Sequence, residues 1–145
     1  MGMAVNACTV PAAAKPSFEL KDDEVEIGIG IHGEPGTHRE KISPVNDIAD
    51  KLLEKILAEG IYSKGDEVAV MVNGMGGTPL MELFVANKHV SDVLAGKGIK
   101  VWKTLVGNYM TSLDMEGFSI TLLKLDEELK KYLAAPADTP AFVQC

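Results

Sequence analysis

The chain has 145 residues and a formal charge of −7, and 46% of its residues are apolar while 24% are charged. This length suits one domain, and an ordinary apolar fraction with interspersed charges excludes an intrinsically disordered chain. The sequence pI of about 4.9, with no stripe of Lys and Arg, argues against binding to a nucleic-acid backbone. No apolar run approaches the roughly 18 residues of a membrane helix, so we expect no membrane partner.

The two cysteines, Cys8 and Cys145, lie near opposite ends of the chain. Two cysteines so placed do not form the disulfide framework of a small secreted domain, and Cys8 is expected to act as a small buried apolar residue. The opening segment has no basic residue before Lys15, as a signal peptide would, and is therefore expected to be part of the fold. We predict a cytoplasmic protein in which residues 1–145 form a single domain.

The first predicted elements are a strand and a helix. Residues 25–31 (VEIGIGI) alternate strictly between apolar and other side chains, which predicts a strand, and the acidic residues just before and within it are expected to face solvent. Ser43 and Pro44 predict a helix with Ser43 as N-cap, ending at Gly60. Its apolar side chains recur at helical spacing: Ile48, Leu52, Leu53, Ile56 and Leu57.

The second half of the chain repeats the alternation of strands and helices. Residues 66–72 (DEVAVMV) predict a buried strand, followed by the glycine-rich turn NGMGG from Asn73 to Gly77. Thr78 and Pro79 predict the start of a helix that extends to Leu94, with an apolar stripe of Leu80, Leu83, Phe84 and Val90. Residues 99–106 and 118–125 predict two further strands, and residues 126–133 a short helix.

Alternating strands and helices indicate an α/β fold: a layered mixed sheet, partly parallel, flanked by helices. Several strands are expected to be parallel. The strand at residues 118–125 follows the preceding one too closely for a helical crossover, so it is expected to be antiparallel.

The segment GIGIHGEPG at residues 28–36 is the most informative local feature. If the strand extends to its end, Gly28, Gly30 and His32 share a face, and the two glycines leave a slot beside the imidazole that a small ligand could enter. The alternative is structural: the glycines bend the strand, and His32 satisfies a buried backbone group. Spacing alone does not separate the two interpretations.

Other residues carry weaker signals. The turn at residues 73–77 opens a helix, where backbone amides can bind an anion, but it lacks the Lys and hydroxyl residue of a P-loop and is more simply a tight connection. His38, in a polar loop, and His89, late in a helix, are interpreted as incidental. No group of residues has the spacing of a metal site, so no metal is expected.

Five ordered blocks closely resemble the dihydroxyacetone-binding subunit of dihydroxyacetone kinases. They are ACTVPAAAKPSF (7–18), EIGIGIHGEPG (26–36), VNGMGGTPLMEL (72–83), LVGNYMTSLDMEGFSITLLKLD (105–126) and APADTPA (135–141). The resemblance implies that His32 binds dihydroxyacetone covalently, through the ketone carbon, as a hemiaminal. Gly28, Gly30 and Glu34 are then expected to line the substrate site. Glu34 or a nearby carbonyl is the hypothetical acceptor that fixes the tautomer of the imidazole.

The chain resembles only about the C-terminal half of that subunit, so the preceding half is expected to be absent and the chain alone to be inactive as a kinase. In the family, the phosphoryl group comes from a nucleotide (ADP or ATP) held with magnesium on a partner L subunit or domain. The resemblance favours the phosphotransferase-linked form, served indirectly by a phosphocarrier subunit. No cofactor is expected in this chain. Ala14 stands where the family commonly has glycine.

Three hypotheses remain. The leading one is the substrate-binding portion of a dihydroxyacetone kinase that works with the L subunit and forms a homodimer. The second is a non-catalytic paralogue, either a ligand sensor or a co-activator, which could bind the same ketone. The third is an inactive fragment whose apolar strands bury surface against another copy. The blocks containing residues 73–77 and 111–114 are expected to form an interface or a pocket wall.

Overall fold

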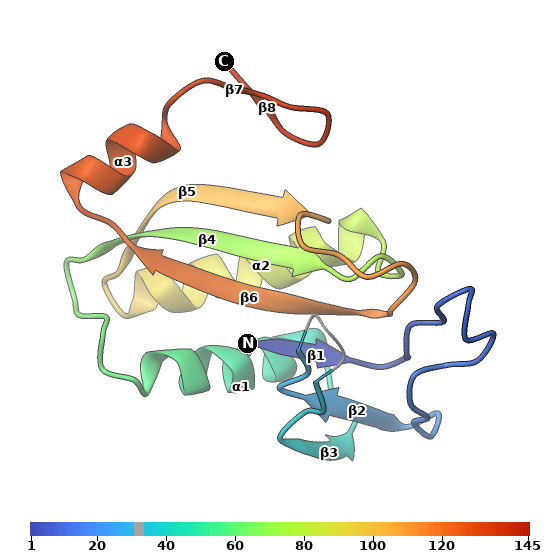
Figure 1. The fold of residues 1–145 in the computed structure, drawn as a ribbon. Helices are drawn as coiled ribbons and strands as arrows, with labels where there is room; N and C mark the ends of the chain where they lie inside the picture. Colours follow the sequence, from blue (N-terminus) through green and yellow to red (C-terminus); the bar gives the residue numbers. More distant parts are fainter. Residues whose placement is uncertain (31–33) are drawn as a thin grey trace.

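The computed structural model describes residues 1–30 and 34–145. A six-stranded sheet forms its centre, in the spatial order β3-β2-β1-β6-β4-β5 (Figure 1). These strands are β1 (Gly2–Ala4), β2 (Glu24–Ile27), β3 (His38–Lys41), β4 (Glu67–Gly74), β5 (Lys100–Gly107) and β6 (Gly117–Lys124). The helices are α1 (Val45–Leu57), α2 (Leu80–Gly96) and α3 (Glu127–Leu133), and a small hairpin of β7 (Ala137–Asp138) and β8 (Val143–Gln144) follows.

The sheet is mixed, as predicted, but its parallel part is smaller than expected. Within the part of the chain that the structure describes, only β4 and β5 pair in parallel, with α2 as the crossover, and every other pairing in the sheet is antiparallel. The antiparallel position of β6 beside β4 confirms the prediction made from the short preceding connection. The expectation of several parallel strands is wrong because the short N-terminal strands pair with their neighbours in antiparallel fashion.

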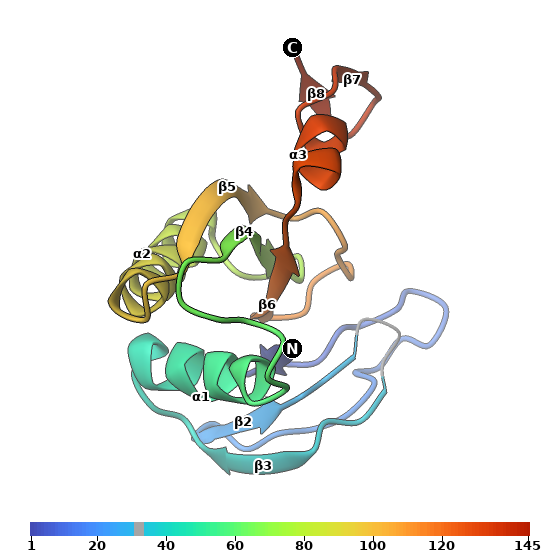
Figure 2. The same cartoon turned by 90° about the vertical axis from the view of Figure 1, so that its left-hand side faces the viewer.

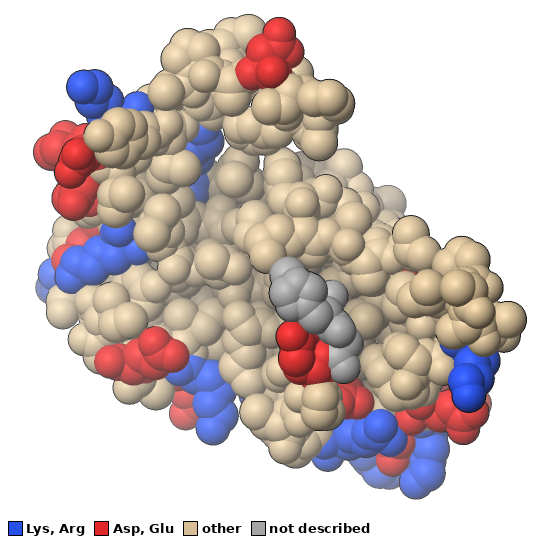
Figure 3. Space-filling model, viewed as in Figure 1, with Lys and Arg blue, Asp and Glu red and all other residues tan. Residues whose placement is uncertain are grey.

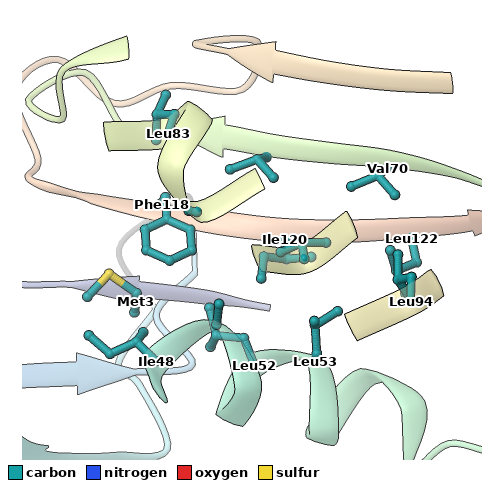
Figure 4. Packing of buried hydrophobic residues seen from close by; sticks show 14 of the residues in the cluster. Met3, Ile48, Leu52, Leu53, Val70, Leu83, Leu94, Phe118, Ile120 and Leu122 are labelled. Atoms are coloured by element: carbon teal, nitrogen blue, oxygen red, sulfur yellow. The ribbon is translucent and has the colours of Figure 1, made fainter. Parts of the chain in front are cut away.

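Both long helices lie on the same face of the sheet (Figure 2). Between them and the strands lies the main core, in which Leu52 and Leu53 of α1 meet Ile120 of β6 and Leu94 of α2 (Figure 4). Alternate residues of β4, Val68, Val70 and Val72, are almost completely buried in this core. The period-two pattern of the strand and the helical stripe of α1 therefore match the observed packing.

The opening segment belongs to the fold. β1 lies between β2 and β6, and the amino group of Met1 donates a hydrogen bond of 2.8 Å to the Ile120 carbonyl. Burial lowers the pKa of that amino group, with the Glu59 charge acting in the opposite direction. Cys8 is buried, as expected, and Cys145 is exposed.

Both long helices begin one residue later than predicted. Pro44 and Pro79 are the N-caps, with extended ψ angles of 147° and 142°, and neither helix has a side-chain cap hydrogen bond. The Thr78 hydroxyl instead donates to the Gly117 carbonyl (2.7 Å) and accepts from the Gly117 amide (2.8 Å), which ties the start of α2 to β6. Ser43 and Thr78 are thus not caps, because each proline is itself the half-helical residue.

Three further predictions about elements need correction. The strand predicted at residues 25–31 ends at Ile27, where Gly28 takes a φ of +85°. β4 includes Asn73 and Gly74, which were assigned to the turn. On α2, Leu83 and Val90 are buried, but Leu80 and Phe84 are each 53% exposed, because the sheet covers a narrower stripe of this apolar helix than its spacing suggests.

The C-terminal segment extends beyond the sheet (Figure 2). Asp126 caps α3 by accepting a hydrogen bond of 2.8 Å from the Leu129 amide. The Lys103 ammonium on β5 donates to the Leu133 carbonyl (2.8 Å) and to the Gln144 side chain. Tyr109 and Phe142 meet edge to face, with ring centroids 6.2 Å apart. These contacts hold the tail against β5.

Candidate functional site

The loop between β2 and β3 contains the residues singled out by the sequence. Its two ends are tied to the sheet: the Gly28 amide donates to the Gly2 carbonyl (2.7 Å), and the Thr37 amide donates to the Ile27 carbonyl (2.7 Å). Residues 31–33 lie outside the described residues, so the structure gives no position for the predicted nucleophile His32. What it shows is how the chain enters and leaves that segment.

Other parts of the loop pack closely against Gly28 and Gly30, but the two glycines are not part of strand β2. The alternation that would place both glycines on one face ends at Ile27, because Gly28 takes a left-handed φ that side chains rarely adopt. A Cβ on Gly30 would overlap the Glu34 carboxylate and lie 2.9 Å from its Cδ. Glu34 therefore occupies the space beside Gly30, whereas the slot predicted beside the imidazole of His32 lies outside the described residues. The Gly30 amide also donates to the Glu34 carbonyl (3.1 Å).

A buried carboxylate contacts the end of this loop that leads into β3. Glu26 of β2 is one of the buried polar residues, although the sequence placed it in a solvated acidic run. Its Oε1 accepts a hydrogen bond of 2.6 Å from the Gly36 amide, and its Oε2 lies 3.4 Å from Nε of Arg39 on β3. The prediction failed because the partners that make burial possible come from the loop and the next strand.

A second, smaller core connects the loop to other parts of the chain. It consists of Ala4, Cys8, Ile29, Met75 and Met115, with Phe18 packed against it. A Cβ on Gly2 would lie 2.8 Å from Cε of Met75 and 3.0 Å from the Ile29 carbonyl oxygen, so this packing is close. Four of the five resembling blocks therefore contribute residues to one cluster, which includes Ile29 of the loop between β2 and β3.

The turn at residues 73–77, which contributes Met75 to this cluster, is hydrogen-bonded to the chain just after β5. Asn73 is fully buried; its Nδ2 donates to the Met110 carbonyl (2.9 Å), and its Oδ1 accepts from the amides of Tyr109 (2.9 Å) and Met110 (2.8 Å). The Ser112 hydroxyl donates to the Met75 carbonyl (2.5 Å). Sequence reasoning assigned no role to these side chains because their partners lie more than thirty positions away.

The glycine turn fits a tight connection better than an anion site. Gly76 has a φ of +104°, and a Cβ there would lie 2.7 Å from the carbonyl carbon of Leu113. The Gly77 amide is already used, because it donates to the Met115 carbonyl (2.9 Å). The Thr9 amide, which donates to Asp114, lowers the pKa of that carboxyl, with a smaller contribution from the Cys8 thiol.

The two remaining histidines have structural partners. His38 begins β3, where its Nδ1 lies 3.0 Å from the Thr37 hydroxyl. His89 Nε2 lies 2.8 Å from Asp50 Oδ1 and so connects α2 with α1. Among residues 1–30 and 34–145, no group of three His, Cys, Asp or Glu side chains is arranged to hold a metal ion. No helix in the same residues is long and apolar enough to cross a membrane.

The Dak1 domain pattern matches residues 1–141, which is nearly the whole chain. The chain belongs to the Dak1 domain family. This Dak1 domain is 53% identical over 143 residues to the dihydroxyacetone-binding subunit DhaK of the PTS-dependent dihydroxyacetone kinase 1 of Listeria innocua serovar 6a. That match covers 98% of this chain and 44% of the Listeria subunit. The predicted family resemblance is thus confirmed.

Solved structures agree with the fold. The dihydroxyacetone kinase operon co-activator Dha-DhaQ superimposes with a TM-score of 0.84 at 40% identity, covering 93% of this chain and 42% of that one. The dihydroxyacetone kinase from C. freundii, in complex with AMP-PNP and Mg²⁺, superimposes with a TM-score of 0.78 at 27% identity, covering 99% of this chain and 26% of that one. The Dak1 domain therefore spans less than half the length of these relatives.

Proposed function

We propose that this Dak1 domain is the ketone-binding portion of a dihydroxyacetone kinase and that His32 captures dihydroxyacetone as a covalent hemiaminal. The observation that carries the proposal is the family match over residues 1–141, which includes the block EIGIGIHGEPG with its histidine. The 53% identity to a subunit named for dihydroxyacetone binding supports the same ligand.

The chemistry needs only the imidazole and the ketone. A neutral imidazole nitrogen attacks the carbonyl carbon, the carbonyl π electrons move to oxygen, and that oxygen takes up a proton while the ring loses its N–H proton. The product has one new C–N bond and one new hydroxyl. Glycerol has no carbonyl group and is excluded from this reaction. Selectivity therefore comes from reactivity as well as from shape.

Glu34 is our proposed acceptor for the second ring nitrogen of His32. Its backbone carbonyl accepts from Gly30, and its side chain lies against Gly30, so the residue is folded back along the loop that contains His32. A carboxylate in hydrogen-bond contact with an imidazole fixes the tautomer and favours the protonated ring. Glu34→Gln is expected to change the pH dependence of adduct formation. An unchanged pH profile would exclude this role for the side chain.

The full kinase activity is proposed for the complete protein. Phosphoryl transfer to the bound substrate would come from a nucleotide with magnesium on a partner L subunit, and the PTS-dependent relative favours a phosphotransferase-linked donor. This Dak1 domain alone is expected to be inactive as a kinase. The test is product formation by the full-length protein with its L subunit, compared with the domain and the same L subunit.

A non-catalytic co-activator is the second candidate function, because Dha-DhaQ superimposes with the TM-score of 0.84. Ketone binding does not distinguish a co-activator from a kinase, since both could bind the same ligand. Phosphoryl transfer does distinguish them, because only a kinase forms the phosphorylated product. A full-length protein that forms the adduct but gives no dihydroxyacetone phosphate with any nucleotide-bearing partner would favour the co-activator.

The decisive experiment is carbon NMR of dihydroxyacetone labelled at the ketone carbon, titrated with this Dak1 domain. We expect a bound resonance at a tetrahedral-carbon shift, distinct from the free hydrate and absent in His32→Ala. His38→Ala is the matched control, because His38 lies at the end of the same loop but contacts the Thr37 hydroxyl. Survival of the resonance in His32→Ala would refute His32 as the nucleophile, and its loss in His38→Ala as well would show that the loss is not specific to His32.

Self-association is a further part of the proposal. Several large apolar side chains on the loops around the second core are exposed, among them Val10, Met110 and Leu113. Figure 3 shows charged side chains mainly towards the edges of the viewed face. We expect such a surface to bury itself in a homodimer. Sedimentation velocity over a hundredfold concentration range tests this, and a strict monomer would contradict it.

A further inference from the structure

Glu26 is a buried carboxylate whose only hydrogen bond among the described residues goes to the loop that contains His32. Its side chain is 8% exposed, and Oε1 accepts from the Gly36 amide at 2.6 Å. Oε2 has no hydrogen-bond partner within residues 1–30 and 34–145 and lies 3.4 Å from Nε of Arg39. Arg39 also donates to the Glu19 carbonyl (3.0 Å), which holds its guanidinium at this position.

The close packing around Gly36 allows its amide to reach the Glu26 carboxylate. A Cβ at Gly36 would lie 2.5 Å from the Ile27 carbonyl oxygen and 2.6 Å from Cγ of Glu26. Only glycine lets the loop backbone approach the carboxylate and the strand so closely. Burial of a charged carboxylate is costly unless it is paired and hydrogen-bonded, so an apolar residue on β2 would be the simpler choice for stability alone.

We propose that Glu26 is a positioning residue: through its hydrogen bond to the Gly36 amide it fixes the part of the loop at residues 34–37 and thereby strengthens ketone binding at His32. This inference rests on the proposed function of His32. Arg39 lies 3.4 Å from the carboxylate and orients it, and the hydrogen bond to the Gly36 amide couples that orientation to the loop. A binding segment that spends less time in its competent conformation binds its ligand more weakly in proportion.

The test compares Glu26→Leu and Glu26→Gln with wild type, using Glu24→Gln as the matched control on the same strand. Glu24 interacts with Lys21 rather than with the loop. For Glu26→Leu we expect the Gly36 amide to exchange with solvent at least about tenfold faster and the apparent affinity for labelled dihydroxyacetone to fall roughly tenfold, which corresponds to about 1.4 kcal/mol. Glu26→Gln keeps an acceptor oxygen and should show a smaller change in both.

The midpoint of thermal unfolding distinguishes an effect of Glu26→Leu on loop positioning from an effect on the stability of the fold. Arg39 is half exposed and stays hydrated when Glu26 is replaced, so Glu26→Leu is expected to unfold at nearly the wild-type temperature while the adduct weakens. Unchanged Gly36 exchange in Glu26→Leu would overturn the proposal. So would faster Gly36 exchange with unchanged adduct affinity, because the hydrogen bond would then hold the loop without affecting the site.

A wild-type protein that forms no adduct would refute covalent binding by this domain, yet it would still leave the positioning role open to test. The second readout is the rate at which diethyl pyrocarbonate modifies each histidine, measured by mass spectrometry of the peptides. His89, which contacts Asp50 on the helical layer, is the internal reference. We expect the ratio of the His32 rate to the His89 rate to change at least threefold in Glu26→Leu. An unchanged ratio would overturn the inference.

Discussion

Ala14 carries the one backbone conformation in the described chain that clearly disfavours its side chain. It has a φ of +52° and is the only residue other than glycine with a positive φ among residues 1–30 and 34–145. The left-handed conformation costs an L-residue roughly 1–2 kcal/mol relative to glycine. The family that the sequence resembles commonly has glycine at this position. The structure shows that the alanine is strained.

Replacing Ala14 with glycine should therefore stabilise the protein. Relief of strain contributes about 1–2 kcal/mol, and the greater freedom of glycine in the unfolded chain opposes it by about 0.4–1 kcal/mol, which leaves a gain of about 1 kcal/mol. Because Ala14 is exposed, the lost methyl removes little packing. For a domain of this size the midpoint of thermal unfolding should rise by about 3 °C.

The matched control is Ala13→Gly in the same exposed turn. Ala13 has no positive φ, and its amide donates to the Val10 carbonyl (2.9 Å), so glycine relieves nothing there. Its free energy of unfolding should fall by about 0.4–1 kcal/mol, measured by urea denaturation of both variants side by side. If Ala14→Gly lowers stability as Ala13→Gly does, the strain argument is wrong.

Three further predictions concern stability. Asn73→Ala should lower the free energy of unfolding by about 3 kcal/mol, because it removes the three hydrogen bonds that the buried Asn73 side chain makes to the backbone of Tyr109 and Met110; a loss below about 1 kcal/mol in urea titration would contradict this. Leu53→Ala should cost about 2–5 kcal/mol, since Leu53 is 1% exposed in the main core, and a smaller loss would mean that the core collapses into the space. The Lys130 hydrogen bond lowers the pKa of Glu67, so this pair stabilises the fold above the ordinary glutamate pKa and loses its effect as pH falls through the lowered value. Thermal unfolding should thus separate Lys130→Gln from wild type at pH 7 and bring them together in acid; an equal difference at both would refute the assignment.

Periodicity in the sequence predicted most of the sheet and the main core. β5 and β6 lie within one residue of their predicted bounds, because a short run of alternating or apolar residues has few other ways to be buried. The α1 stripe at Ile48, Leu52 and Leu53 is buried as predicted. Such local patterns do not say which strands will be neighbours, and the expected number of parallel pairs was accordingly too high.

The candidate site was less predictable because its contacts are not local. The sequence identified the HGEPG block and its glycines, but it placed Glu26 in solvent and left Asn73 without a role. The burial of Glu26 depends on Gly36 and Arg39, ten and thirteen positions further along the chain. A run of charged residues predicts solvent exposure from local sequence alone, and it carries no information about a backbone amide of the next loop that binds one of the carboxylates.

The segment with the proposed nucleophile is attached to the fold at points that serve different purposes. Gly28 and Thr37 close the loop on the sheet through backbone hydrogen bonds that almost any sequence could make. Ile29 and Gly36 make side-chain-specific attachments, to the second core and to Glu26 respectively. Together with the backbone hydrogen bond from the Gly30 amide to the Glu34 carbonyl, these specific attachments fix the two described ends of the loop, residues 28–30 and 34–37. Substitutions at Met75 or Glu26 should accordingly change ligand binding more than their effect on stability would suggest, whereas substitutions in the helical core should change both together.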